Sequence, residues 1–314
     1  HEVPTHPQGT VRVLPGTRIP ADWAVTALVG VLALVNLPTL WQAELVDPVL
    51  SRDEQPPAAW RAAADDLDDP TGRVLQLPGL EFGAFRWGYT VDQPLAGMTD
   101  SPLVTRDLLP LGSPQAMDLL YALDDRIQDG VLEPAALAPV TRLLGATSVW
   151  LTNDAAYDRF DVTAPGVVRA WLDAAEGIGA AAAYGALALN QPDVEMVDAR
   201  YLGDSGATAP AAPVEVYPVE HSPGVARAAA GTLVVSGNGD GVVDAAAAGL
   251  LPADAALVYS AATAPHDLAD VLADSDGLLV TDSNRARARH WRSSQDTTGF
   301  TESAGRDGAV PTEL

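Results

Sequence analysis

The sequence predicts an α/β protein: one transmembrane helix followed by an extracytoplasmic α/β region with a mainly parallel sheet. Three observations predict it. The stretch from Trp23 to Ala43 carries no formal charge, strand-like and helix-like runs alternate after it, and 47% of the 314 residues are apolar. Strands that alternate with helices favour a parallel sheet with helices packed on its faces, and this apolar content is enough to build a core.

The composition excludes several classes of protein. There are 42 acidic and 18 basic residues, all of the basic ones arginine, and the net charge is −24. A body this acidic repels phosphate backbones, so we expect no nucleic-acid partner. Because cysteine is absent and no two of the five histidines are spaced i, i+4, we predict no disulfide, no metal site and no cofactor.

The uncharged stretch comes first among the predicted elements. Its 21 residues would span ~31 Å as a helix, close to the ~30 Å hydrocarbon core of a bilayer. Trp23 and Trp41 lie near its ends, where tryptophan prefers the membrane interface. We therefore predict a transmembrane helix over 23–43, preceded by a loop over 1–22. A buried core helix is the alternative.

The charges on either side of this helix predict its orientation. Arg12 and Arg18 precede it, whereas Glu44 and Asp47 follow it. The positive-inside rule places the arginine side in the cytoplasm, so the bulk of the chain is expected on the extracytoplasmic side of the cell membrane.

The next elements make up an extracytoplasmic α/β region over 44–210. Pro56 and Pro57 begin a helix, Pro78 and Gly79 end a strand, and Ser113 caps a second helix. The predicted helices are 58–67, 114–128, 134–144 and 167–175, and the predicted strands are 74–77 and 147–152. An aromatic loop over 80–100 contains Phe82, Phe85, Trp87 and Tyr89.

Strands and helices alternate again towards the end of the chain and predict a βαβ-type subdomain over 211–303, with a tail over 304–314. Short apolar runs rich in valine and leucine predict strands, and alanine-rich runs between them predict helices. The strands are 214–219, 232–236, 256–260 and 277–281, and the helices are 243–251 and 264–272.

A glycine-rich loop, 236–241, follows one of these strands and precedes a helix. That context suits a phosphate-binding loop, but the spacing is G-x-G-x-G, and Asp240 puts a carboxylate where a phosphate would lie. A tight strand-to-helix turn is favoured. A soluble nucleotide-binding α/β enzyme stays open as an alternative.

Three polar runs resemble the membrane alpha-(1→3)-arabinofuranosyltransferases, which are GT-C glycosyltransferases of the mycobacterial-type cell envelope. They are GMTDSPLVTRDLLPLGSP at 97–114, DLLYALDDR at 118–126, and TDSNR at 281–285 continued by HWRSSQD at 290–296. The resemblance implies transfer of arabinofuranose from decaprenyl-phosphate-arabinose to the arabinan of arabinogalactan or lipoarabinomannan. It also implies an inverting mechanism in which an acidic general base activates an acceptor hydroxyl.

The resemblance further implies that this chain is an internal fragment. In the family, the catalytic acidic residue lies on the first extracytoplasmic loop, among amino-terminal membrane helices that we expect upstream of residue 1. Carbohydrate-binding modules are expected beyond residue 314. We therefore predict no catalytic residue within the chain, and expect it to shape the acceptor side of the parent enzyme.

Two groups of residues are candidates for substrate contact under this reading. Trp87 and Tyr89 could stack on sugar rings, while three other side chains could hydrogen-bond hydroxyls: Arg86, Asp100 and Arg106. Alternatively, the aromatic rings form a small core under a long loop. A basic cluster could hold an anion or a glycan, or pair with the chain's own carboxylates; its candidate residues are Arg285, His290, Trp291 and Arg292. The alternative function is a non-catalytic, membrane-anchored glycan-binding or scaffold domain.

Overall fold

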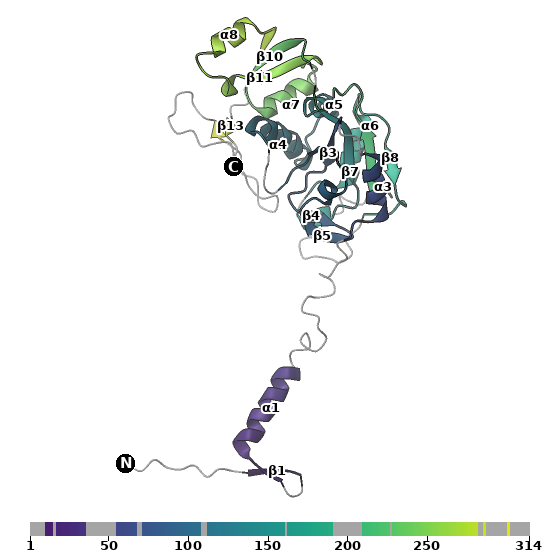
Figure 1. Ribbon diagram of the computed structural model, residues 1–314, viewed down its shortest axis with the longest axis vertical. Helices are drawn as coiled ribbons and strands as arrows, with labels where there is room; N and C mark the ends of the chain where they lie inside the picture. The colour runs from purple at the N-terminus through teal and green to yellow at the C-terminus, as the bar shows by residue number, and fades with distance from the viewer. Residues whose placement is uncertain are drawn as a thin grey trace, which may run out of the picture. The chain divides into compact units, whose positions relative to one another are not determined.

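The computed structural model divides the chain into two compact units, residues 1–52 and residues 53–314. The structure describes residues 10–14, 17–35, 55–67, 71–107, 112–160, 162–190, 209–226, 228–281, 285–286 and 300–301. Each unit is described by itself (Figure 1).

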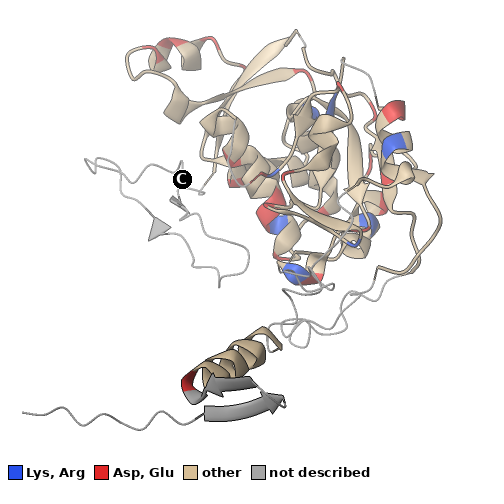
Figure 2. Cartoon of the chain, turned by 60° about the horizontal axis from the view of Figure 1, so that its bottom comes forward, with Lys and Arg blue, Asp and Glu red and all other residues tan. Residues whose placement is uncertain are grey.

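The first unit is a two-stranded hairpin followed by one helix. Strands β1 (Thr10–Leu14) and β2 (Thr17–Pro20) are antiparallel, and α1 (Ala21–Val35) follows at once. Along α1, Figure 2 shows one acidic turn, which contains Asp22, and no further charge. No helix among the described residues is long and apolar enough to cross a membrane. The predicted span over 23–43 is therefore not confirmed, and its part over 36–43 lies outside the described residues.

The second unit is built on a five-stranded sheet with the strand order β6-β3-β7-β9-β8. Its central strand, β7, is parallel to β3, which is in turn parallel to β6, but β9 runs antiparallel to both β7 and β8. The strands are β3 (Arg73–Leu77), β6 (Leu103–Val104), β7 (Ala146–Thr152), β8 (Ala182–Tyr184) and β9 (Val214–Pro218). The α/β class is confirmed, but this sheet is mixed and not mainly parallel as predicted. The prediction of direction failed because an apolar run predicts a strand without fixing its direction.

Helices cover both faces of this sheet. Successive side chains of a strand point to opposite faces, so Val149 and Leu151 of β7 enter one core cluster and Trp150 enters the other. The helices of the first cluster are α4 (Pro114–Gln128), α5 (Leu137–Leu143) and α6 (Pro165–Ala174), whereas α3 (Ala58–Asp66) belongs to the second.

A second, three-stranded sheet is wholly parallel and has the order β11-β10-β12. Helix α7 packs against α4 and α5 and adds Val242 and Val243 to the first core cluster (Figure 1). The two sheets therefore share one core. The elements are β10 (Gly231–Ser236), α7 (Gly239–Ala247), β11 (Ala255–Tyr259), α8 (Leu268–Ala273) and β12 (Gly277–Val280).

Short elements complete the described part of the chain. The aromatic loop predicted over 80–100 contains a hairpin, β4 (Gly83–Phe85) and β5 (Gly88–Val91), and a 3-10 turn, η1 (Pro94–Gly97). The others are η2 (Pro134–Ala136), η3 (Tyr157–Arg159), η6 (Ser260–Ala262), β13 (Arg285–Ala286) and β14 (Phe300–Thr301).

Candidate functional site

Three of the predicted substrate-contacting residues lie on the β4–β5 hairpin. Arg86 and Trp87 form its two-residue turn, and Tyr89 follows on β5. The turn is docked on the segment after β7, because the Arg86 backbone N–H donates to the carbonyl oxygen of Asp154 at 2.8 Å. The hairpin is thereby held at the carboxyl end of a central strand, where ligands of α/β sheets commonly bind.

The indole of Trp87 packs into the second core cluster. Its ring stacks on Phe85 with centroids 4.9 Å apart and an interplanar angle of 4°, and meets the edge of Trp60 at 5.5 Å. One face of the half-buried ring is therefore occupied by Phe85, and only the other could receive a sugar. Trp87 holds the hairpin against α3 whether or not a ligand binds.

A buried carboxyl group lies at the base of this aromatic cluster. The Trp60 indole N–H donates to Asp154 Oδ2 at 3.0 Å. Burial raises the pKa of Asp154 to about 7, and the Trp60 and Trp87 indoles and the Arg86 guanidinium oppose this shift only in part. Asp154 is therefore a carboxyl group that changes charge close to neutral pH.

The guanidinium of Arg86 joins the hairpin to two loops. It lies 2.5 Å from Asp158 Oδ1, its Nε donates to Asn190 Oδ1 at 2.5 Å, and it stacks over the Tyr157 ring at 5.3 Å. Arg86 thus reaches residues that line the neighbouring pocket.

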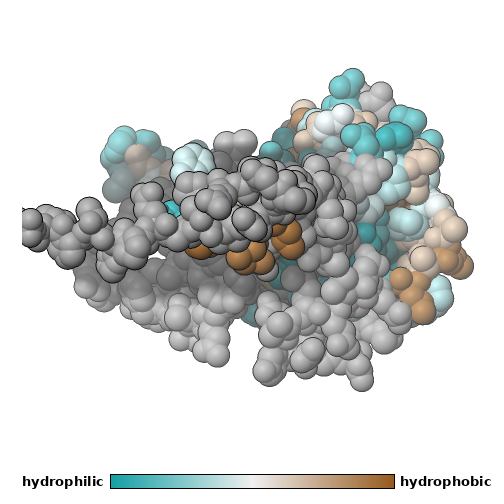
Figure 3. Space-filling view, turned by 90° about the horizontal axis from the view of Figure 1, so that it is seen from below, coloured by the Kyte–Doolittle hydropathy of each residue, from teal (hydrophilic) through white to brown (hydrophobic). Residues whose placement is uncertain are grey.

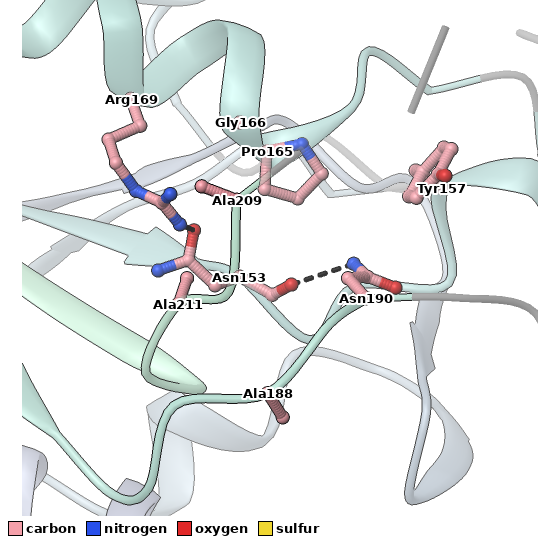
Figure 4. Close-up of a pocket in the computed structure, with 9 residues that line it drawn as sticks. All are labelled: Asn153, Tyr157, Pro165, Gly166, Arg169, Ala188, Asn190, Ala209 and Ala211. Atoms are coloured by element: carbon pink, nitrogen blue, oxygen red, sulfur yellow. Dashed lines mark hydrogen bonds between the residues drawn. The ribbon is translucent and has the colours of Figure 1, made fainter. Parts of the chain in front are cut away.

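That pocket lies between the end of β7, the first turn of α6 and the segments beside β8 and β9 (Figure 4). Arg169 Nη2 donates to Asn153 Oδ1 at 2.7 Å, and Asn190 Nδ2 donates to the Asn153 carbonyl oxygen at 2.7 Å. The pocket is small: about 10 Å³ of it is open to the centre of a water-sized sphere, and the space of about 240 Å³ around it includes open solvent. It is lined by Asn153, Tyr157, Pro165, Gly166, Arg169, Ala188, Asn190, Ala209 and Ala211.

The chemistry of this lining suits binding. Amide, phenol and guanidinium groups donate and accept hydrogen bonds, and the lining includes no carboxylate and no histidine. General acid–base catalysis needs a group that exchanges a proton with the substrate, which these side chains do not supply near neutral pH.

One face of the Tyr89 ring is covered by an arginine side chain. The Arg159 guanidinium lies 4.2 Å from the centroid of the Tyr89 ring and 5.4 Å from that of Phe160. This cation–π contact pairs the hairpin with η3 and covers one face of the ring.

Arg106 lies in a different, buried cluster. Its Nη1 donates to Asp124 at 2.8 Å and to Asp125 at 2.7 Å, and its Nη2 lies 3.3 Å from Glu81. Burial alone would lower the pKa of Arg106, but Asp124, Asp125 and Glu81 together raise it. Arg106 is thus engaged by carboxylates of its own chain. Asp100 is exposed on the surface after η1.

The second predicted group lies mostly outside the described residues. Arg285 begins β13, whose backbone pairs with β14, but its side chain is not described. His290, Trp291 and Arg292 lie wholly outside the described residues, so their predicted role stays a prediction.

The glycine-rich loop forms a capped helix start. Asn238 is the N-cap of α7, and its side chain accepts from the Asp240 and Gly241 amides at 3.1 and 3.5 Å. The Gly239 amide donates to the carboxylate of Asp118. Amides that a phosphate would use are engaged by the chain's own oxygens, so the tight turn favoured from the sequence is what the structure contains.

Sequence reasoning missed four polar residues of this region. Asn153 and Asp154 directly follow a predicted strand, and that position was a usable signal. Arg169 and Asn190 gave none, because Arg169 is brought near β7 by the packing of α6 and Asn190 by the pairing of β8 with β9. Among the described ranges, no group of three or more histidines and carboxylates could hold a metal ion.

The second unit is thus an α/β region with a small amide- and guanidinium-lined pocket beside a cluster of aromatic rings. Residues 4–309 match the family model described as the N-terminal GT-C domain of alpha-(1→3)-arabinofuranosyltransferase, and the chain belongs to that family. The resemblance of the three polar runs is thereby confirmed at the level of a membrane glycosyltransferase family.

Two curated relatives carry the same description. The alpha-(1→3)-arabinofuranosyltransferase of Mycolicibacterium smegmatis is 28% identical over 57% of this chain and 12% of its own length. That of Mycobacterium tuberculosis is 28% identical over 62% of this chain and 14% of its own length. The aligned regions are therefore small parts of much longer proteins.

Solved structures agree in fold. The cryo-EM structure of the arabinofuranosyltransferase AftD from mycobacteria has a TM-score of 0.66 and 22% identity, over 89% of this chain and 21% of that one. A structure of a mutant of that enzyme has a TM-score of 0.61 and 21% identity, over 76% of this chain and 19% of that one. At these identities the likeness concerns the fold alone.

Proposed function

We propose that this chain is a region of a membrane arabinofuranosyltransferase that moves arabinofuranose from decaprenyl-phosphate-arabinose to cell-wall arabinan. The observation that carries the proposal is the family match over residues 4–309. In this proposal the chain is an internal fragment. In it, amino-terminal membrane helices supply the catalytic acidic residue that acts as general base, and carbohydrate-binding modules lie beyond the carboxyl end.

The apolar helix and the charges around it support a membrane location in this proposal. The large apolar side chains of α1 are between 45% and 72% exposed, from Leu34 to Trp23. A patch of that kind on a protein points to a lipid or protein contact. In this proposal the span over 23–43 lies in the membrane, and the bulk of the chain is on the extracytoplasmic side.

We assign the pocket beside the β4–β5 hairpin to the acceptor side of the reaction. About 10 Å³ of the pocket is open to the centre of a water-sized sphere, which is room for roughly one water, so we expect the pocket to receive a single hydroxyl group of a longer glycan and not a whole sugar ring. Its lining lacks a proton-transferring group, which fits binding of the acceptor and leaves the chemistry to the rest of the enzyme.

The test is to obstruct the pocket from its rim. Ala209 is exposed and lines the pocket, so Ala209→Trp in the full-length parent enzyme would fill the pocket without disturbing a core position. We expect arabinan extension to fall about tenfold or more, mainly through a higher KM for the acceptor, since ~1.4 kcal/mol of lost binding is a factor of ten.

The matched control is Ala248→Trp, an exposed alanine at the end of α7, which should leave extension unchanged. Full activity of the Ala209→Trp enzyme would exclude the pocket from the reaction. The alternative, a non-catalytic glycan-binding or scaffold domain, is favoured by the same lining. It would be preferred if the chain bound arabinan oligosaccharides while the obstructed parent still extended arabinan normally.

A further inference from the structure

The outer edge of the five-stranded sheet is an open strand. β8 ends the strand order and pairs with β9 on one side. Isolated bridges at Ile178 and Ala188 continue this pairing at both ends, so residues 178–188 form one long ribbon. Within the described residues no strand pairs with its other side. An edge of this kind presents unpaired backbone N–H and C=O groups to any strand that approaches.

This edge carries none of the usual protection against such pairing. Edge strands are generally protected from pairing by charged side chains, especially lysine, or by proline. Residues 177–190 contain no charged residue and no proline. Leu187 is 69% exposed and Leu189 is 52% exposed. In Figure 3, apolar atoms gather at the right-hand margin of the second unit, the side on which Figure 1 has β8. In a chain of net charge −24, an uncharged, exposed ribbon is an unusual surface.

The chemistry of the edge discriminates between possible occupants. Hydrocarbon cannot satisfy the backbone groups of an edge strand, so a lipid tail is disfavoured. A second copy would bring another body of net charge −24 against the first, and the two would repel each other. A polypeptide strand without charged side chains satisfies both the backbone groups and the apolar side chains.

We propose that residues 178–189 are a docking edge for an extended, uncharged strand from another part of the same enzyme. This rests on the proposed function, in which the chain is a region of a longer transferase. The aligned regions are 12% and 14% of the curated relatives' lengths, so polypeptide that could supply the strand is plentiful in such proteins. Ala188 also lines the pocket, so the added strand would end beside the acceptor site.

Hydrogen–deuterium exchange tests the docking edge without a known ligand. Amide exchange of a peptide covering 180–189 is compared between the 314-residue chain and the full-length parent enzyme. We expect exchange at least tenfold slower in the parent, because outward amides gain strand partners there. Leu187→Lys in the parent should restore fast exchange, since a lysine blocks edge pairing. Leu250→Lys is the matched control and should change nothing, because Leu250 is 59% exposed in the turn that follows α7.

Three results would overturn the docking edge. Equal exchange in chain and parent means that no strand is added. Protection of the isolated chain that grows with its concentration assigns the edge to a second copy. Protection that appears only with vesicles of phosphatidylethanolamine and phosphatidylglycerol assigns it to lipid. Arabinan extension by the same parent is measured separately, so protection without transfer would contradict the proposed function and leave the edge in place.

Discussion

The carboxyl group of Asp154 occupies an unusual position for an acid. It accepts a hydrogen bond from the Trp60 indole at 3.0 Å, and burial raises its pKa to about 7. The backbone carbonyl of the same residue accepts from the Arg86 amide in the hairpin turn. Its chemistry connects the aromatic cluster to the β4–β5 hairpin. A negative charge that develops there as the pH rises is disfavoured by burial and only partly stabilised by the two indoles and the guanidinium.

This position predicts a pH-dependent stability. The folded pKa lies above the unfolded value of ~3.9, so the folded state binds more protons and the free energy of unfolding falls between about pH 4 and pH 7. The slope from this group is at most ~1.4 kcal/mol per pH unit. Asp154→Asn keeps an acceptor for the indole but does not titrate.

We therefore expect Asp154→Asn to gain stability relative to the wild type from pH 4.5 to pH 7.5, by an amount on the order of a few kcal/mol. Urea denaturation at pH 4.5, 6.0 and 7.5 measures it, and other groups cancel in the difference. Asp65→Asn, at an exposed position on α3, is the control. A difference between Asp154→Asn and wild type that does not change with pH would contradict the raised pKa.

At the scale of elements, the Arg106 cluster fixes α4 on the sheet. Arg106 follows β6, Glu81 follows β3, and Asp124 and Asp125 lie on α4. Asp124 also accepts from the Gly79 amide at 3.0 Å, where a Cβ on residue 79 would lie only 2.4 Å from the carboxylate. One cation therefore joins three separate segments, and its role is to hold them together.

Arg106→Met should be strongly destabilising. It keeps much of the side-chain length but leaves three carboxylates without the cation that they share, which typically costs ~3–5 kcal/mol for a buried pair. Urea denaturation at pH 7 measures the loss.

Arg61→Met on α3 removes an exposed arginine and should cost little. A loss below about 1 kcal/mol for Arg106→Met would mean that the cluster does not organise these elements. The same variant tests whether Arg106 also contacts the sugar, as the sequence predicted. If Arg106→Met loses stability while the affinity for the acceptor is unchanged, Arg106 has a structural role and does not bind the acceptor.

At the scale of the molecule, local signals in the sequence predicted most elements and few of the contacts. Ser113 and Pro114 predicted the start of α4. In the structure the Ser113 side chain caps this helix by accepting from the Ala116 amide. The antiparallel direction of β9 was not predictable, since an apolar run has no direction. Part of the pocket depends on that pairing, because Asn190, which donates to the Asn153 carbonyl, follows β8, and β8 joins the sheet through β9.

The division into two units predicts that the second unit folds without the first. Both core clusters, with the side chains packed against them, consist of residues between Trp60 and Leu279, so deletion of residues 1–52 removes no core side chain. We expect the free energy of unfolding of 53–314 to equal that of the whole chain within ~0.5 kcal/mol. Urea denaturation of both chains measures it.

The same deletion should abolish membrane binding. The whole chain carries the exposed apolar side chains of α1, and burying each in a bilayer gains roughly 1.5–3 kcal/mol, whereas the charge of −24 on the chain disfavours an anionic surface. Flotation with phosphatidylethanolamine vesicles should therefore retain the whole chain and lose 53–314. Val29→Asp with Leu32→Asp, both exposed on α1, should detach the whole chain without changing its unfolding. Flotation of 53–314 would instead place the lipid contact on the second unit, and the apolar edge at 178–189 would then be the first surface to examine.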